Sequence, residues 1–271
     1  FVGVFGCFIF VGLFCCVVFV SGVCFDAHVG SCQVSDVTIT VGSGSDSSAL
    51  MNNGGILSSF SLGITENLTF GVSFGLQEFI GIGNLKKNKS YPEVQLKYRV
   101  YDESETMPAV LIGLDTQGKG RFIDRQDYNR YEYKAMGVYC VLSRNYSFLG
   151  NLGFHMGLNK NLFENDDGDD DINLFFGFDK EINRSFSILA EYNLARDDDN
   201  TVDDESLVIR KGRGYLNAGL RWSATNNLML EVNVNDITKN NEYSLDNDQL
   251  YDSMNREVKI IYFENLLRYI L

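Results

Sequence analysis

LTFGVSFGL, residues 68–76, is the stretch that decides the fold, because its even-numbered residues are apolar and its odd-numbered residues are small or polar. Successive side chains of a β-strand point to opposite faces, so a period of two predicts a strand with one apolar and one polar face. The same alternation recurs in residues 148–158 and 228–235. The chain is therefore predicted to be all-β.

The alternation extends along most of the chain, and the links between strands are alternately short and long. The predicted strands are 37–42, 55–65, 67–79, 93–102, 107–115, 131–143, 146–158, 171–179, 184–194, 213–223, 227–235 and 256–263, and the short links include 102–106, 144–145, 180–183 and 224–226. Membrane barrels keep short turns on the periplasmic side and long loops outside. We therefore predict a closed, antiparallel, up-and-down transmembrane β-barrel of about twelve strands over 37–263, in the outer membrane of a Gram-negative-type bacterium.

Composition agrees with one large β-domain. The chain has 271 residues, of which 45% are hydrophobic, and only 2 are Pro. Scarce proline suits paired strands, where proline would remove a donor from the ladder. The mean hydropathy is -0.10. This low value is compatible with a barrel, because half of each strand faces a polar interior.

Net charge and its placement limit the partners. The formal net charge is -13, and acidic residues are concentrated in 164–171 and 197–205. This balance excludes nucleic acid as a partner, since nucleic acids attract basic patches. The acidic segments are interpreted as solvated loops or, alternatively, as divalent-cation sites. An EF-hand does not fit, because Phe163 and Leu174 would occupy its first and twelfth ligand positions.

The first 25 residues are almost wholly apolar and contain no Lys, Arg, Asp or Glu. We expect a signal peptide over 1–24, with a retained helical anchor or a lipoprotein attached through Cys24 as alternatives. A short periplasmic lead over 25–36 and a C-terminal extension over 264–271 complete the domain prediction. Only Cys32 and Cys140 would remain after cleavage, too few for a disulfide scaffold.

Parity along each strand assigns its two faces. Outward-facing aromatic residues are predicted at Phe70, Phe74, Tyr98, Phe148, Phe154, Phe176, Phe178, Phe186, Tyr192, Trp222 and Tyr262. Inward-facing polar residues are predicted at Gln95, Lys97, Arg99, Asp115, Asn151, His155, Asn173, Glu191, Asn217, Arg221, Glu231 and Asn233. Arg221 and Glu231 lie nearly opposite each other in one hairpin and form a predicted ion pair. The inward residues either fill the lumen or line a selective polar path.

A longer motif resembles a known family. Residues 107–120 read MPAVLIGLDTQGKG, residues 128–134 read YNRYEYK, and residues 216–222 read LNAGLRW. As a set they resemble YjbH-type outer-membrane barrels, which are associated with bacterial exopolysaccharide production. The resemblance covers about 100–263 and implies a non-catalytic role in polysaccharide export or surface assembly. It also implies polysaccharide and periplasmic export components as partners, beside membrane lipid and lipopolysaccharide.

The same motif contains a predicted ligand site at the outer rim. Asp115 ends a strand there, and Gly118 and Gly120 permit an unusual turn. Tyr128, Tyr131 and Tyr133 are expected either to form a platform on which a sugar ring stacks or to belong to a packed loop that caps the barrel.

Residues for catalysis are scarce. His28 and His155 are the two histidines, no Ser/His/Asp set can be assembled from the pattern, and no P-loop or His-Glu-x-x-His occurs. We expect no enzyme, no cofactor, no metal site and a monomer. Two alternatives to polysaccharide export remain: an envelope barrel with partner-binding or cation-binding loops, and a small-solute channel. In the channel, Lys97, Arg99, Asp115 and Glu231 would set selectivity, with His155, Glu191 and Arg221 among the polar lumen residues.

Overall fold

The computed structural model describes residues 17–20, 23–26, 34–43, 54–80, 84–125, 128–199, 208–244, 250–252 and 254–265. Within these ranges the regular structure is β, apart from the three-residue 3-10 helix η1 (Arg196–Asp198). None of the helical structure in the described ranges is long and apolar enough to cross a membrane.

One large antiparallel sheet forms the body of the molecule. Its long strands are β3 (Val34–Ser43), β4 (Gly54–Gly63), β5 (Leu68–Ile80), β7 (Glu93–Tyr101), β8 (Ala109–Asp115), β11 (Gly137–Ser147), β12 (Asn151–Lys160), β13 (Asn173–Asn183), β14 (Phe186–Asn193), β16 (Tyr215–Ser223), β17 (Leu228–Asn235) and β20 (Asn255–Asn265). The sheet has 13 strands in the described ranges, because the two-residue β6 (Lys86–Lys87) adds to β5.

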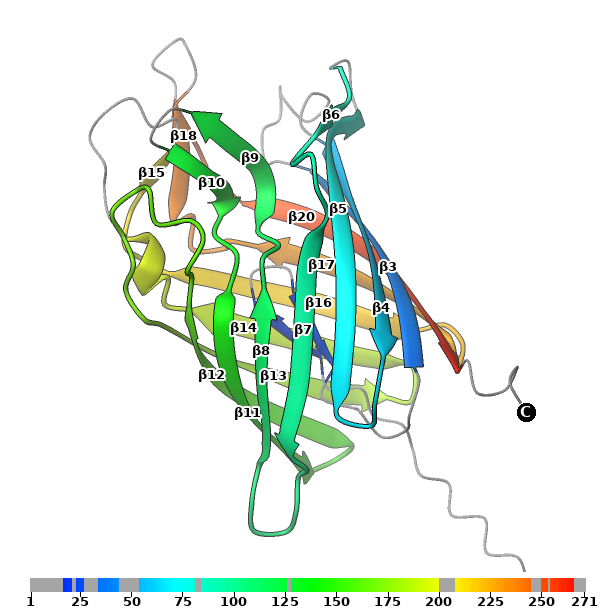
Figure 1. Cartoon of the computed structure of the whole chain (residues 1–271). Coiled ribbons are helices and arrows are strands. Elements are labelled where there is room, and N and C mark those ends of the chain that lie inside the picture. Colours follow the sequence, from blue (N-terminus) through cyan, green and yellow to red (C-terminus); the bar gives the residue numbers. More distant parts are fainter. Residues whose placement is uncertain are drawn as a thin grey trace, which may run out of the picture.

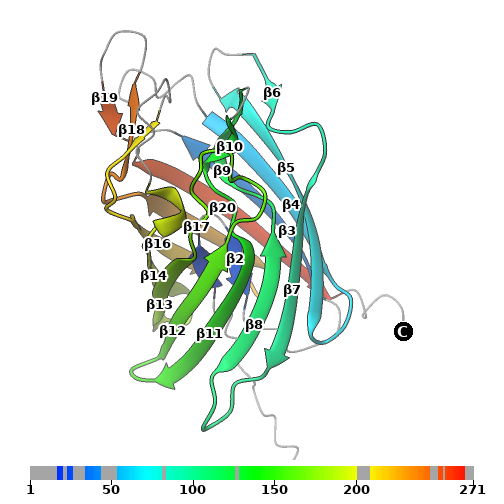
Figure 2. The same ribbon diagram turned by 60° about the vertical axis from the view of Figure 1, so that its left-hand side comes forward.

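Pairing follows chain order around the sheet. The order is β4-β3-β20-β17-β16-β14-β13-β12-β11-β8-β7-β5-β6, and β4 pairs with β5 as well as with β3. The succession of pairings therefore returns to the strand where it begins. Both views show the sheet curled around a central axis (Figures 1 and 2). The predicted all-β antiparallel sheet of about twelve strands is confirmed.

One predicted strand, 131–143, is wrong in its first half. The wall strand β11 begins at Gly137, and the residues before it form β10 (Tyr128–Tyr133), which pairs with β9 (Lys119–Arg125) in a separate hairpin. Gly137 has φ 68°, and a Cβ there would lie 2.2 Å from the Lys160 carbonyl oxygen. The backbone therefore turns sharply at this glycine, and β10 leaves the wall.

The short link predicted at 144–145 is also displaced. β11 continues to Ser147, with Asn145 paired to Gly153, and the turn lies at 148–150. Leu149 and Gly150 both have positive φ, 48° and 101°. Two successive residues of positive φ suit the twist of a tight hairpin, so the turn forms here.

The two faces of the sheet differ as parity predicts. The outer face exposes Phe70, Phe74, Tyr98, Phe154, Phe176, Phe178, Phe186, Trp222 and Tyr262, together with many aliphatic side chains. Tyr192 is half-buried, and Phe148 is exposed in a turn. The inner face buries Asp115, His155, Asn173, Glu191, Asn217, Arg221, Glu231 and Asn233, while Gln95, Lys97, Arg99 and Asn151 are half-buried there.

The inner face is not uniformly polar. On β8, β11 and β13 a small apolar cluster is built around Tyr139 and Phe175, which are 2% and 0% exposed. Glycines make room for both rings: a Cβ at Gly113 would lie 2.3 Å from the Tyr139 ring, and one at Gly157 would lie 2.2 Å from the Phe175 ring. The inner faces of β16, β17 and β20 carry mainly charged and amide side chains, and they also bury Met229 and Ile261.

Smaller elements lie at the end of the sheet that carries the long loops, which we call the mouth. They are the β9–β10 hairpin and the three-stranded sheet of β15 (Val208–Arg210), β18 (Asn241–Ser244) and β19 (Leu250–Asp252). Figures 1 and 2 show both above the main sheet, opposite the short turns.

The chain's first described strands form a hairpin of β1 (Val17–Val20) and β2 (Val23–Asp26), and β1 lies next to β13 and β14. The rest of the predicted signal peptide (1–24), most of the predicted lead (25–36) and residues 266–271 lie outside the described residues.

Candidate functional site

Asp115 begins the candidate site, because it is the last residue of β8 and its side chain is fully buried. The Gln117 backbone N–H donates to Asp115 Oδ1 at 2.8 Å, and Gln95 Nε2 donates to Oδ2 at 3.2 Å. These bonds direct the chain away from the wall just after β8. The next residues therefore start the β9–β10 hairpin instead of extending the sheet.

The two glycines in this turn let the hairpin strands approach closely. A Cβ at Gly118 would lie 2.5 Å from Tyr131 Cβ, and Gly120 has φ 78° with Glu132 beside it. Any larger residue at Gly118 would separate β9 from β10. The predicted need for glycine at these positions has this physical reason.

The hairpin reaches strands on different sides of the curled sheet. Lys119 Nζ lies 2.9 Å from Glu257 Oε1 on β20, and Ser73 Oγ on β5 donates to Gln117 Oε1 at 2.9 Å. Tyr131 OH donates to Glu93 Oε1 on β7 at 3.1 Å. Through the β4–β5 pairing, the strands β7, β5, β4 and β3 separate β8 from β20, and six strands of the described sheet separate them the other way round. The hairpin therefore bridges the mouth.

The predicted tyrosines are packed into this bridge. Tyr131 is 0% exposed and Tyr133 is 5% exposed, and the Tyr133 ring meets the Tyr215 ring edge-on at 5.1 Å between centroids. The Lys89 ammonium lies 5.0 Å from the centroid of the Tyr131 ring. The Tyr128 backbone belongs to β10, but its side chain lies outside the described part of the chain. Neither Tyr131 nor Tyr133 presents a ring face to solvent.

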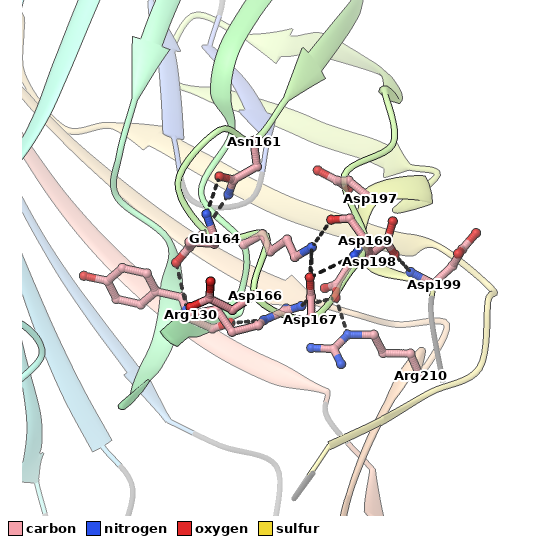
Figure 3. Close-up of polar contacts among 12 residues, drawn as sticks. Arg130, Asn161, Glu164, Asp166, Asp167, Asp169, Asp197, Asp198, Asp199 and Arg210 are labelled. Atoms are coloured by element: carbon pink, nitrogen blue, oxygen red, sulfur yellow. Dashed lines mark hydrogen bonds and ion pairs between the residues drawn. The ribbon is translucent and has the colours of Figure 1, made fainter. Parts of the chain in front are cut away.

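Acidic loops surround β10 and converge on its cations (Figure 3). Arg130 Nη1 lies 2.5 Å from Asp167 Oδ2 and 2.7 Å from Asp198 Oδ1. Lys134 Nζ lies 2.8 Å from Asp167 Oδ2, and Arg210 Nε forms a further ion pair with Asp198. We call Arg130, Lys134, Asp167, Asp198 and Arg210 the loop cluster.

This arrangement corrects part of the interpretation of the acidic segments as solvated loops, since Asp166 and Asp170 are exposed as expected but several of their acidic neighbours are buried. Glu164, Asp169, Asp197 and Asp198 are each at most 5% exposed, because cations from β10 and β15 hold the loops against the hairpin. Residues 200–207 lie outside the described residues. The sequence offered one signal for this cluster: the motif YNRYEYK carries two cations within a strongly acidic context.

Glu164 attaches the first acidic loop to the hairpin backbone. The backbone N–H groups of Tyr131 and Ala135 donate to its carboxylate at 2.8 and 2.6 Å, and Asn161 Nδ2 donates at 2.8 Å. Burial raises the pKa of Glu164, although these hydrogen bonds favour the ionised form. The carboxylate therefore acts as a common acceptor that fixes β10 and the segment that follows it.

Two neighbouring carboxyl groups in η1, Asp197 and Asp198, have pKa values shifted in opposite directions. Burial, followed by the adjacent Asp198, raises the pKa of Asp197 to about 7. Burial also opposes ionisation of Asp198, but Arg130 and Arg210 outweigh it and hold the pKa of Asp198 well below its usual range. Asp198 is therefore the permanent anion of the loop cluster, and Asp197 changes charge near neutrality.

The predicted inward residues occupy several separate places. Arg221 Nε lies 2.6 Å from Glu231 Oε1, which confirms the predicted pair, and Asn217 Nδ2 donates to Glu191 Oε1 at 3.3 Å. Lys97 is half-buried on β7. Arg99 lies at the short-turn end, where it bonds the Glu66 carbonyl and Asn67 at 3.1 Å each. Arg99 therefore lies apart from Asp115 and Glu231, with which it was grouped.

Ser143, His155 and Asp179 form an array that corrects the expectation that no Ser/His/Asp set can be assembled. Ser143 Oγ lies 2.6 Å from His155 Nδ1, and His155 Nε2 lies 2.8 Å from Asp179 Oδ1. The three side chains share the inner faces of β11, β12 and β13 and are at most 5% exposed. Parity combined with strand register would have found them.

Acyl transfer needs more than this array, because the oxyanion of the intermediate requires its own donors. The backbone here is committed to the ladders of β11 with β12 and of β12 with β13. A Cβ at Gly153 would lie 2.4 Å from Asp179 Oδ1, so the glycine gives this carboxylate its room. We interpret the array as a polar brace across three strands.

Across the described ranges no group of three or more His, Cys, Asp or Glu is arranged to hold a metal ion.

Comparisons with known proteins give structural likeness without a family. No family model and no curated protein matches the chain. A NanC porin superposes with a TM-score of 0.43 and 11% identity over 84% of this chain and 99% of that one. An outer membrane channel from Pseudomonas putida F1 gives 0.39 and 8% over 86% and 96%. The outer membrane channel DcaP of Acinetobacter baumannii gives 0.32 and 8% over 86% and 96%. Likeness at this level identifies no function.

Proposed function

We propose that this chain is a closed, twelve-stranded β-barrel of the outer membrane that conducts small polar solutes through a lumen bridged at its mouth by the β9–β10 hairpin. The observation that carries the proposal is the contrast between the two faces of the sheet. Outward side chains such as Phe176, Trp222 and Tyr262 are apolar and more than 40% exposed, whereas inward residues such as Glu231 and Asn233 are polar and at most 2% exposed.

An exposed apolar face on every side of a curled sheet supports a lipid environment. Soluble monomers rarely expose large contiguous apolar surfaces, and outer-membrane barrels present an apolar band outward and a polar interior. The pairing of β4 with both β3 and β5 supports closure of the barrel. Closure would satisfy the backbone of every strand inside lipid, where an open edge is excluded.

The bridged mouth supports a narrow conduit more than a wide pore. The Lys119–Glu257 pair, with side chains 11% and 9% exposed, fastens the hairpin to the wall opposite its origin. Solutes that enter through the mouth would have to pass this bridge. We therefore expect low conductance while the pair is intact.

Planar-bilayer recording of the refolded full chain tests the proposal. The parent should show small, steady, salt-dependent conductance steps, and the double variant Lys119→Met/Glu257→Gln should show larger ones. Removing both partners leaves neither member of this pair as an unpaired buried charge, and Lys259, the other cation beside Glu257, keeps Glu231 as its neighbour across the ladder. Lys86→Met, which removes an exposed pair with Glu78, is the matched control and should leave the steps unchanged. Absence of conductance from both the folded parent and the double variant would rule out a channel.

The exopolysaccharide role implied by the YjbH-type resemblance stays a prediction. The same holds for lipopolysaccharide, polysaccharide and periplasmic export components as partners, and for the monomeric state. Deleting the gene in its native host and measuring surface polysaccharide would test that role separately from conductance.

A further inference from the structure

The inner faces of β16, β17 and β20 carry a group of polar side chains that neither the bridge nor the loop cluster explains. The members of this inner patch are Arg221, Glu231, Asn233, Asn235, Glu257 and Lys259, each at most 7% exposed. Strand register sets them side by side: Glu231 lies between Arg221 and Lys259, and Asn233 lies opposite Glu257. The inner patch is therefore one continuous surface on three neighbouring strands.

Charges in the inner patch are balanced. Arg221 pairs with Glu231 at 2.6 Å, and Lys259 Nζ lies 3.8 Å from Glu257 Oε2. Lys119 enters from the hairpin and pairs with Glu257, and Glu191 of β14 adds one further anion in contact with Asn217. With three cations and three carboxylates, the surface offers no net attraction to an anionic or a cationic solute.

Two asparagines, Asn233 and Asn235, stand out in the inner patch. They are 2% and 4% exposed, and across the described residues neither the amide nitrogen nor the amide oxygen of either one has a hydrogen-bond partner. Asn233 is the one that lies two residues from Glu231 on the same face of β17. Oε2 of the neighbouring Glu231 likewise has no hydrogen-bond partner among the described residues. Leaving such a group unsatisfied costs about 1–3 kcal/mol, and native proteins satisfy buried amides with protein, water or a ligand.

Local packing gives the amide of Asn233 its position. A Cβ at Gly219, the residue opposite on β16, would lie 2.1 Å from Asn233 Oδ1. The glycine therefore leaves the space into which the amide extends. An apolar side chain at position 233 would fit the same space and leave no polar atom unsatisfied. The asparagine therefore indicates that a polar group binds beside it.

We propose that the inner patch binds a neutral polyhydroxylated solute such as a mono- or disaccharide. An amide supplies one donor and one acceptor side by side, which matches two neighbouring hydroxyl groups, and Glu231 Oε2 accepts from a third. Balanced charge favours a neutral solute over a charged one of the same size. This inference rests on the proposed function, because the solute reaches the patch through the lumen.

Equilibrium dialysis of the folded full chain in detergent micelles tests the site, with glucose and maltose as probes and gluconate and glucosamine as charged analogues. The parent should bind glucose or maltose saturably and more tightly than either analogue. Asn233→Leu should weaken this binding by at least about tenfold, equal to about 1.4 kcal/mol. Asn151→Leu, which removes an inner-face amide whose Nδ2 donates to Asn145 Oδ1 at 3.4 Å, is the matched control and should bind like the parent.

A second variant keeps the test independent of folding defects. Gly219→Ala leaves Asn233 in place but displaces its amide, so it should also weaken sugar binding while the gel mobility of the folded barrel stays unchanged. The site is overturned if the parent shows no saturable sugar binding, if gluconate or glucosamine binds as tightly as glucose, or if folded Asn233→Leu binds like the parent. Conductance without sugar binding overturns the site alone, and sugar binding without conductance overturns the channel alone.

Discussion

The loop cluster at the mouth and the inner patch on β16, β17 and β20 are both buried and both charged, yet their polar atoms are satisfied differently. Arg130 alone bonds two aspartates and two backbone carbonyls. By contrast, no described residue forms a hydrogen bond with the amide nitrogen or the amide oxygen of Asn233. A satisfied network holds segments in one arrangement, whereas unsatisfied groups favour binding something else.

The difference follows from where the residues of each set lie in the chain and in the fold. The loop cluster joins segments far apart in the chain, such as Arg130 and Asp198, which are 68 residues apart. Its ion pairs act together with a small apolar cluster of Tyr133, Ala195 and Tyr215 to hold these segments against the hairpin. The inner patch lies on strands whose backbone is already fixed by the ladder, so its side chains are not needed to hold the fold. Comparing variants in the two regions therefore separates stability from binding.

Loss of Arg130 should have the largest effect. Arg130→Met leaves the buried carboxylates of Asp167 and Asp198 with fewer partners, and breaking a buried pair typically costs about 3–5 kcal/mol. Urea unfolding, followed by gel mobility, should show a fall in the free energy of unfolding of this order. Lysine is a poor replacement, because it cannot form the four directed bonds of the guanidinium group.

The matched control for this variant is Lys160→Met. Lys160 pairs with Asp170 at 3.4 Å, but the two side chains are 40% and 67% exposed. Exposed pairs of this kind contribute roughly 0–1 kcal/mol. If the two variants lose the same free energy of unfolding, the loop cluster does not hold the mouth together.

Asp197 gives a pH-dependent test of the same region. Its pKa, raised to about 7, means that the folded chain keeps a proton that the unfolded chain releases near the ordinary aspartate pKa of 3.8. The free energy of unfolding should therefore fall as the pH rises between these values, by at most about 1.4 kcal/mol per pH unit.

Replacing this group with its uncharged analogue should remove that slope. Asp197→Asn should match the parent near pH 4 and exceed it in stability at pH 8, and the contact with Asn159 Nδ2 can be kept through the new amide oxygen. Unfolding in urea at both pH values measures the difference. Parallel pH profiles for parent and variant would show that Asp197 ionises normally in the folded state.

Local pattern was enough to predict the wall of the molecule. In β17 the alternation of 228–235 matches a strand whose inward residues Met229, Glu231, Asn233 and Asn235 are buried. The pair Arg221–Glu231 followed from parity and one short turn. Where prediction failed, at 131–143 and 144–145, the outcome depends on positive φ at Gly137, Leu149 and Gly150, which alternation does not report.

The candidate site was less predictable, because its contacts are non-local. Asp115 was expected at the rim and is buried there, but the burial of Tyr131 depends on Glu93 and Glu164, which lie 38 and 33 residues away in the chain. No local pattern pairs Lys119 with Glu257. The three cations of the loop cluster were overlooked because the acidic segments alone resemble solvated loops.

Two inward asparagines give the smallest and most direct comparison. Asn173 Nδ2 donates to the Asn159 and Asn193 side chains at 3.1 and 2.7 Å, and its Oδ1 accepts from the Leu174 and Arg196 backbone. Asn173→Ala should lower the free energy of unfolding by about 1–3 kcal/mol, because it leaves buried groups without partners.

Asn233→Leu should leave the free energy of unfolding unchanged or raise it, since it removes two unsatisfied atoms without breaking a hydrogen bond. Urea unfolding of both variants without sugar measures this contrast. An equal loss at both positions would mean that Asn233 is bonded within the fold, and the inner patch would then lack the feature that favours binding.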